Sequence, residues 1–235
     1  ENNHASMIEG IRKGNSDKFI WKHNDVDHLE YLLKNSNKDH PKIVAFESVY
    51  SMDGDFAPIK KIIEVSKKYN ALTYLDEVHG VGLYGKNGGG LSEQLGLTSE
   101  IDIIEGTLAK GFGLMGGYIT AKYNIIDVIR SFAPGFIFTT SLPPSLAAAA
   151  VASIRYVKNN YSLREALYER SEKLKKLMLA KNLPIIKNNS HIVPLLVKDP
   201  VRCKEISDIL LNEYSIYVQP INYPTVPRGL ERLRF

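Results

Sequence analysis

The chain has 235 residues, of which 44% are hydrophobic, and a formal net charge of +4. Its lysines and arginines are spread along the chain, which argues against a nucleic-acid-binding stripe and modestly favours an anionic ligand. No apolar run approaches the roughly 20 residues that span a bilayer, and the single cysteine, Cys203, excludes an internal disulfide framework. We therefore expect a soluble protein of a reducing compartment, with a sizeable hydrophobic core and Cys203 as an inert packing residue.

Apolar runs alternate with amphipathic segments in the first part of the chain. We expect buried strands at residues 43–46, 71–75 and 101–104, and a helix at 58–69 that opens with a proline. Strand, helix, strand in this order predicts an α/β fold with a mostly parallel sheet, covered on both faces.

The second part of the chain follows a Pro-Pro stop at residues 143–144. The pattern predicts an alanine-rich helix and a charged helix, followed by a mixture of strands and one helix. These elements fall at 146–159, 162–179, 192–197 (strand), 201–213 (helix) and 216–218 (strand). We place a boundary near residue 155, which separates a large domain (1–155) from a smaller α+β C-terminal domain (156–235).

Three residues of the large domain suggest chemistry. Asp76 ends an apolar run, His79 follows it by three positions, and Lys110 lies in a glycine-rich stretch after the next run. Strand ends are where α/β folds present functional groups. An Asp there can pair with a pyridinium nitrogen, and a lysine can bond a cofactor aldehyde. Taken singly, an Asp at a strand end is often a cap and a lysine among glycines is usually solvated.

The order and spacing of these residues belong to a longer set of motifs. The motifs are NHASMIEGIR (3–12), FESVYSMDGD (46–55), TYLDEVHGVGLYG (73–85), GTLAKGFG (106–113), GGYIT (116–120), GFIFTTSLPP (135–144) and NYPTVPRGLERLR (222–234). With these motifs the chain resembles the 5-aminolevulinate synthases, a family of α-oxoamine synthases among the fold-type I pyridoxal phosphate enzymes.

The resemblance implies a fold and an activity. It implies a fold-type I transferase with pyridoxal phosphate as cofactor and no metal, acting as a homodimer whose active site is shared across the interface. The reaction would be the decarboxylating condensation of glycine with succinyl-CoA to 5-aminolevulinate, the first step of haem and other tetrapyrrole synthesis. The compartment would be the cytoplasm of a bacterium or the mitochondrial matrix of a eukaryote.

The resemblance also implies roles for individual residues. Lys110, His79 and Asp76 would be catalytic. The remaining cofactor contacts would come from His4, which stacks on the ring, and from Ser51, Val78, Thr107, Thr139 and Thr140, the two last reaching the neighbouring subunit's phosphate. Substrate contacts would come from Lys18, Ser51, Thr225 and Arg234, where Arg234 holds the glycine carboxylate.

Other interpretations stay open for several of these residues. His4 alone would more often be a packing residue, Ser51 a turn residue, and the threonine pair part of a strand edge. Lys18 is about as well explained as a solvated side chain, and Arg228 and Arg232 compete with Arg234.

Two other functions also remain open. One is a related α-oxoamine synthase that uses another acyl-CoA, and the other is a catalytically silent cofactor-binding or interaction module. The chain begins at Glu1, inside a motif, so we expect it to be part of a longer enzyme that lacks an N-terminal portion here.

Overall fold

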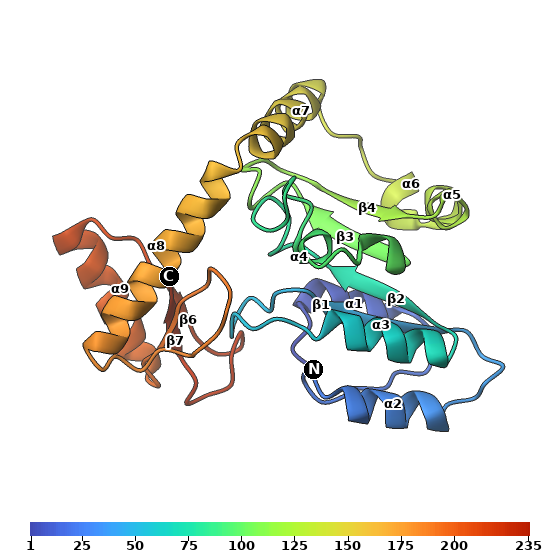
Figure 1. Cartoon of the computed structure of the whole chain (residues 1–235), viewed down its shortest axis with the longest axis horizontal. Helices are drawn as coiled ribbons and strands as arrows, with labels where there is room; N and C mark the ends of the chain where they lie inside the picture. The colour runs from blue at the N-terminus through green and yellow to red at the C-terminus, as the bar shows by residue number, and fades with distance from the viewer. The chain divides into compact units, whose positions relative to one another are not determined.

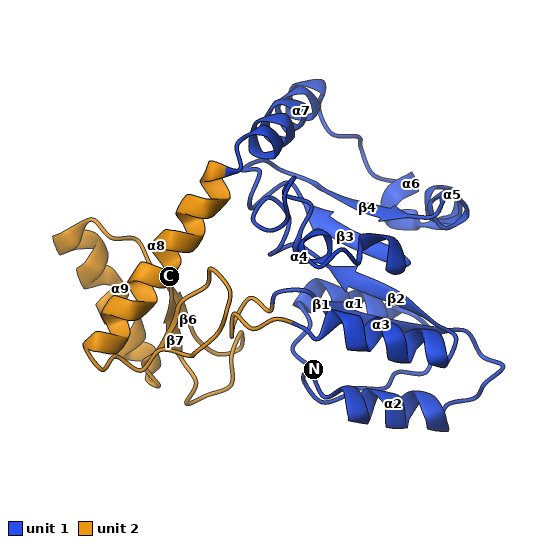
Figure 2. Ribbon diagram, in the orientation of Figure 1, with its two compact units in different colours: residues 1–49, 57–161 blue, residues 50–56, 162–235 orange.

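The computed structural model describes every residue, Glu1–Phe235, and divides into two compact units (Figure 2). Unit 1 comprises Glu1–Val49 and Ala57–Tyr161, and unit 2 comprises Tyr50–Phe56 and Ser162–Phe235. The short segment Tyr50–Phe56 therefore belongs with the C-terminal part of the chain. The division into domains at residue 155 stays a prediction.

Unit 1 is built on a four-stranded sheet in the order β1-β2-β3-β4 (Figure 1). The strands are β1 (Lys42–Glu47), β2 (Ala71–Asp76), β3 (Ile103–Thr107) and β4 (Gly117–Ala121). The first three run parallel, and β4 runs antiparallel to β3. The predicted mostly parallel sheet is confirmed, and the carboxyl ends of its parallel strands meet at one edge.

Helices surround this sheet. They are α1 (Ala5–Lys13), α2 (Val26–Asn35), α3 (Ile59–Lys68), α4 (Leu91–Gln94), α5 (Tyr123–Phe132), α6 (Pro134–Ile137) and α7 (Pro144–Asn159). Helix α3 packs against β2 and α2 packs on α3. Helix α3 buries Ile59, Ile62, Ile63 and Ser66, the spacing expected of one helical face. The predicted helix at 58–69 is thus confirmed.

One predicted strand of unit 1 begins later than expected. The sequence predicted a strand from residue 101, but β3 begins at Ile103 after the 3-10 turn Thr98–Glu100. The carboxylate of Asp102 accepts from the backbone nitrogen and the hydroxyl of Thr73, both at 2.9 Å. A side chain therefore supplies the link to β2 at this level, so regular strand pairing starts one residue further on.

Unit 2 contains a small antiparallel sheet in the order β5-β7-β6. Its elements are α8 (Ser162–Ala180), β5 (Pro194–Leu196), α9 (Pro200–Tyr214), β6 (Gln219–Ile221) and β7 (Arg232–Arg234). Helix α9 packs on the sheet, and Cys203, Val218 and Leu233 form the centre of the core. Cys203 is fully buried and free, as expected of a packing residue.

The strand predicted at 216–218 was wrong in position, because β6 begins at Gln219. Helix α9 ends at Ser215 in the left-handed conformation, with φ of 55°. The backbone nitrogen of Ile216 then donates back to the carbonyl of Leu210. This helix-ending turn uses the residues that would otherwise have started the strand. No helix in either unit is long and apolar enough to cross a membrane.

Candidate functional site

Three carboxylates lie side by side at the carboxyl ends of the parallel strands. Glu47 of β1 is in register with Asp76 of β2, and Asp76 is in register with Glu105 of β3. Residues in register point to the same face of a sheet, so the three side chains form a row on one face. Glu105 accepts a hydrogen bond of 2.6 Å from the hydroxyl of Tyr74.

Asp76 is the middle member of this row and is 5% exposed. Burial raises its pKa to about 6. The backbone nitrogen of Val78 donates a hydrogen bond of 2.7 Å to the Oδ1 atom of Asp76, which lowers the pKa. The charges of Glu105 and Glu77 raise the pKa further, and that of Lys110 lowers it. Asp76 is therefore a carboxylate poised to hold or release a proton near neutral pH, and a cationic partner would favour its charged form.

Glu47 is still more strongly perturbed. Burial, followed by the charge of Asp76, raises its pKa to about 8, so the side chain is mostly protonated at neutral pH. The backbone of His4 donates to this carboxyl group, yet its buried Oε1 has no hydrogen-bond partner. A buried polar atom without a partner is unusual in a native protein and is common at functional sites.

Lys110 lies in the loop between β3 and β4. A hydrogen bond of 2.9 Å closes the loop, in which the backbone nitrogen of Leu108 donates to the carbonyl of Gly116. Thr107 supports the same turn: its hydroxyl donates to the Gly116 carbonyl at 3.2 Å and accepts from the nitrogen of Ala109 at 3.0 Å. The charge of Lys110 acts on both Asp76 and Glu47. The lysine and the two carboxylates therefore share one electrostatic site.

The loop that carries His79 lies against the loop that carries Lys110. A Cβ atom built on Gly111 would be 2.6 Å from the carbonyl oxygen of Val81, and one on Gly82 would be 3.3 Å from the Cα of Gly111. Only glycine allows two backbones to approach so closely. This contact brings the segment just after His79 beside the residue just after Lys110.

Glu77 fixes the start of the His79 loop. Its carboxylate is fully buried and accepts from the Ser48 hydroxyl at 2.6 Å and from the backbone nitrogens of Leu91 and Ser92 at 3.1 and 2.6 Å. Burial raises its pKa, and these hydrogen bonds work in the opposite direction. The side chain therefore joins the end of β1, the end of β2 and the first turn of α4.

His4 is the N-cap residue of α1. Its Nδ1 accepts from the backbone nitrogen of Ser6 at 3.3 Å and lies 2.7 Å from the Ser6 hydroxyl. The neighbouring Asn3 donates to the carbonyl of Ala45 in β1 at 3.0 Å. These contacts tie the histidine to the strand end where Glu47 lies.

The other predicted residues of unit 1 lie at its surface. Thr139 and Thr140 are exposed, in a segment after α6. Lys18 is also exposed, and its Nζ donates to the carbonyl of Gly14 at 2.8 Å. The roles of these three residues toward a phosphate and an acyl-CoA stay predictions.

In unit 2, Ser51 and Arg234 are brought together. The Nη1 atom of Arg234 donates to the carbonyl of Ser51 at 3.2 Å, and Ser51 is 8% exposed. Burial lowers the pKa of Arg234 from its ordinary value, and an arginine guanidinium remains charged in proteins. Thr225 lies in the turn between β6 and β7, where its backbone nitrogen donates to Asn222. The structure gives Thr225 no further contact that defines a role.

The two competing arginines have other tasks. Arg232 is 3% exposed, and its Nη1 pairs with the carboxylate of Asp53 at 2.7 Å. The guanidinium of Arg228 lies over the ring of Tyr223, 5.0 Å from its centre. Both arginines thus have protein partners of their own, and the choice of Arg234 stays a prediction.

Three members of the site were not predicted from the sequence: Glu47, Glu77 and Glu105. A signal was present, because Glu47 ends an apolar run just as Asp76 does, and both precede polar loops. Their alignment could not be read from sequence, because it depends on the strand register. The structure brings together no group of three or more His, Cys, Asp or Glu side chains able to hold a metal ion.

Comparison with known proteins defines the class. The chain matches the family model for aminotransferase class I and II over residues 1–235, and it belongs to that family. It is 57% identical over 234 residues to a 5-aminolevulinate synthase of Rickettsia prowazekii, covering 100% of the chain and 56% of the relative. A second such relative, 5-aminolevulinate synthase 1 of Cereibacter sphaeroides, is 57% identical over 233 residues, with 99% and 57% coverage.

A solved structure of a related enzyme has the same fold. A variant of the serine palmitoyltransferase of S. paucimobilis, with a bound PLP–myriocin aldimine, superposes with a TM-score of 0.93 at 33% identity, covering 99% of this chain and 59% of that one. The fold is thus that of a fold-type I pyridoxal phosphate transferase. The chain spans little more than half the length of these relatives.

Proposed function

We propose that the protein containing this chain condenses glycine with succinyl-CoA and releases carbon dioxide and CoA, forming 5-aminolevulinate for tetrapyrrole synthesis. The observation that carries this proposal is the 57% identity to 5-aminolevulinate synthases along the whole chain. The site supports it, since a buried carboxylate at a strand end and a loop lysine act on each other electrostatically. These are the groups that a pyridoxal phosphate site requires.

The site fits pyridoxal phosphate on the chemistry of its side chains. When bound, this cofactor supplies an aldehyde that captures the glycine amine and a ring that takes up the electron pair left on the α-carbon. Asp76 would hold a proton on the ring nitrogen. A positive ring nitrogen would return the pKa of Asp76 towards its ordinary value, because an opposite charge stabilises the carboxylate.

Lys110 would bond the cofactor aldehyde and, once displaced by glycine, move a proton from the glycine α-carbon. A carbon–carbon bond then forms between that carbon and the thioester carbonyl, and CoA leaves as the thiolate. The glycine carboxyl group departs as carbon dioxide, and a proton returns to the carbon it leaves. Lys110 would thus act at the α-carbon that gives up the electron pair, and Asp76 at the ring that takes it up.

The remaining side chains would orient the cofactor. His79 would donate to the ring oxygen, His4 would stack on the ring, and Thr107 would bind the phosphate. Val78 would act through its backbone, since its nitrogen already orients the Asp76 carboxylate.

For the substrates, we propose that Ser51 and Arg234 hold the glycine carboxylate and that Lys18 and Thr225 contact the acyl-CoA. A guanidinium can grip a carboxylate through two parallel hydrogen bonds, whereas an ammonium acts as a point charge.

We also propose a homodimer in which Thr139 and Thr140 reach the phosphate of the partner's cofactor. The surrounding segment exposes large apolar side chains: Phe132 is 76% exposed and Phe138 is 86% exposed. Apolar surface of this kind is typical of an interface. The relatives compared are bacterial, and we therefore propose a bacterial cytoplasm as the compartment. We also propose that residues 1–155 and 156–235 form two domains.

A product assay tests the proposal. The full-length protein is supplied with pyridoxal phosphate, glycine and succinyl-CoA, and 5-aminolevulinate is measured by mass spectrometry. Product with succinyl-CoA, and none with acetyl-CoA or pimeloyl-CoA, is expected. Product with only another acyl-CoA would assign a related α-oxoamine synthase, and silence with all donors would contradict the proposal.

A further inference from the structure

The segment Tyr50–Phe56, which contains Ser51, is held within unit 2 by polar contacts to its backbone. Arg232 donates to the carbonyl of Met52 at 2.9 Å and pairs with Asp53. Asn188 donates from its Nδ2 to the carbonyl of Asp53 at 3.0 Å. Arg234 donates in addition to the carbonyl of Ser51. Three consecutive residues of a segment without regular secondary structure, 51–53, are therefore held by hydrogen bonds.

Asn188 packs closely on this segment. Gly54 has a φ of 74°, and a Cβ atom added there would lie 2.6 Å from the Asn188 Nδ2 atom. The Asn188 Oδ1 atom in turn accepts from the backbone nitrogen and hydroxyl of Ser190 at 3.1 and 3.3 Å. The amide therefore uses both its ends, one towards residue 53 and one towards residue 190.

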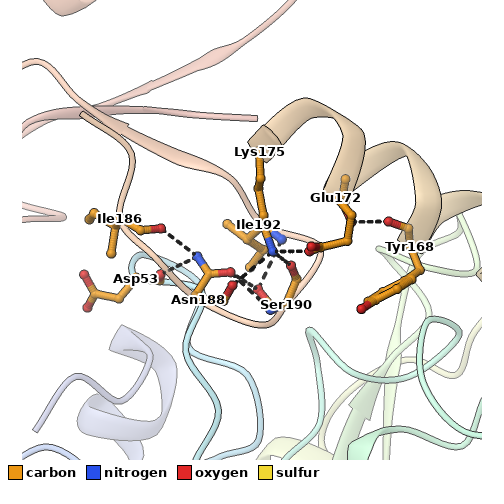
Figure 3. A network of polar contacts seen from close by, with 9 residues as sticks. Asp53, Tyr168, Glu172, Lys175, Ile186, Asn188, Ser190 and Ile192 are labelled. Atoms are coloured by element: carbon orange, nitrogen blue, oxygen red, sulfur yellow. Dashed lines mark hydrogen bonds and ion pairs between the residues drawn. The ribbon is translucent and has the colours of Figure 1, made fainter. Parts of the chain in front are cut away.

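Lys175 of α8 also holds the loop that contains Asn188 and Ser190 (Figure 3). Its Nζ atom donates to the carbonyls of Asn188 and Ser190 at 3.1 and 2.5 Å and pairs with Glu172 at 2.9 Å. All three donors of the ammonium are thus used. Lys175 is 7% exposed, so a charge is kept in the interior.

A buried charge is a poor means of gaining stability. An apolar side chain of similar size is often as stabilising, because it avoids the loss of hydration. What the ammonium provides is directional: it holds two carbonyls of one loop at fixed positions. The charge also reaches His191, whose pKa is lowered to about 4 by burial and by Lys175 and Arg234. The histidine is therefore neutral at neutral pH. Since both charges act on it, Lys175 and Arg234 both lie near His191.

We propose that Lys175 and Asn188 are positioning residues for the glycine carboxylate, holding Ser51 and Arg234 in the geometry that grips it. The chain of contacts runs from Lys175 to Asn188, from Asn188 to Asp53, and through the backbone to Ser51. This proposal rests on the proposed function for the identity of the carboxylate. Both residues would act through Ser51 and Arg234 and not by direct contact with the substrate.

The test uses the full-length protein with pyridoxal phosphate and follows the cofactor absorbance as glycine is added. Lys175→Met is expected to raise the Kd for glycine at least about tenfold, the loss that follows when one charge-assisted hydrogen bond is misplaced. The Kd for the cofactor should stay within about twofold of wild type. Lys175→Arg should restore most of the glycine affinity, and Lys176→Met, an exposed change on the same helix, should have no effect.

Asn188→Ala provides a second variant that leaves the Lys175 ammonium with its backbone acceptors. It should weaken glycine in the same direction, and it decides the matter if Lys175→Met does not fold. Hydrogen exchange at residues 50–56 should be faster in both variants. A glycine Kd within about twofold of wild type in both variants would overturn the positioning role. A wild-type protein that shows no spectral response to glycine would instead overturn the proposed function.

Discussion

Glu47 and Asp76 occupy paired positions at the carboxyl ends of two parallel strands, and the pKa of each is raised, to about 8 and about 6. Two buried carboxylates on register-paired residues of neighbouring strands cannot both be charged without penalty, so one of them holds a proton. The higher pKa identifies Glu47 as that group. Asp76 is left as the carboxylate that can meet a positive ring nitrogen.

The first prediction concerns Glu47 and stability. A carboxyl group whose folded pKa exceeds its unfolded value favours the folded state below the unfolded pKa, and this contribution is lost as pH rises through the folded pKa. The relevant window is therefore about pH 4.5 to 8. Glu47→Gln should remove this pH dependence and stabilise the cofactor-free protein at pH 8 by roughly 2–4 kcal/mol, given about 1.4 kcal/mol per pKa unit.

Urea unfolding at several pH values measures this effect. Glu64→Gln, on the exposed face of α3, serves as the control and should keep the wild-type profile. An unchanged slope in Glu47→Gln would show that Glu47 is not the group that titrates.

The second prediction concerns the charge of Asp76. Asp76→Asn keeps an oxygen for the Val78 nitrogen but cannot hold a proton on a ring nitrogen. We expect kcat to fall by about 10²–10³, the usual effect of removing one stabilising group at a reacting centre. Steady-state kinetics and the cofactor absorbance measure it. Asp27→Asn, exposed on α2, is the matched control, and a rate near wild type for Asp76→Asn would argue against its role.

The third prediction concerns the contact between the two loops. Gly111→Ala places a Cβ atom 2.6 Å from the Val81 carbonyl, so one backbone must move. Displacement of Lys110 from His79 should lower kcat by about tenfold or more, because positioning errors near 1 Å are costly in catalysis. Gly10→Ala, in α1 with open space around it, should be harmless. Equal rates for the two variants would mean that the contact does not align the site.

The fourth prediction concerns Glu77. Glu77→Ala leaves the nitrogens of Leu91 and Ser92 and the Ser48 hydroxyl without their acceptor. Each unsatisfied buried group costs about 1–3 kcal/mol, so we expect a loss of roughly 3 kcal/mol in the free energy of unfolding. Denaturant unfolding measures this, with the exposed Glu169→Ala as reference. A loss below about 1 kcal/mol would show that the loop finds other partners.

Much of unit 1 could be predicted from the sequence. The strands β1 and β2 follow from continuous apolar runs, and α3 follows from the helical spacing of its buried face. The start of β3 was misplaced because Asp102 replaces a backbone pairing with a side-chain one. Strand β4 was not predicted, since it is largely exposed and has no core-facing alternation. Helices α2 and α5 were not predicted either.

The site was predictable in part. Asp76, His79 and Lys110 stand in recognisable motifs; Glu47 also lies in one, FESVYSMDGD, but nothing in that motif marks it as a neighbour of Asp76. Glu47 joins the site only because β1 and β2 pair at that level. The assignment of Ser51 to unit 2 depends on contacts with residues nearly 180 positions away, such as Arg232 with Asp53, and no local pattern reports these.

The central claim is that Lys110 is the residue that bonds the cofactor. The direct measurement is to load the full-length protein with pyridoxal phosphate, reduce it with borohydride, digest it and locate the label by mass spectrometry. The account predicts a pyridoxyl group on the peptide that contains Lys110, and its absence there in Lys110→Ala. Labelling of another lysine in the wild-type protein, or of none, would contradict it.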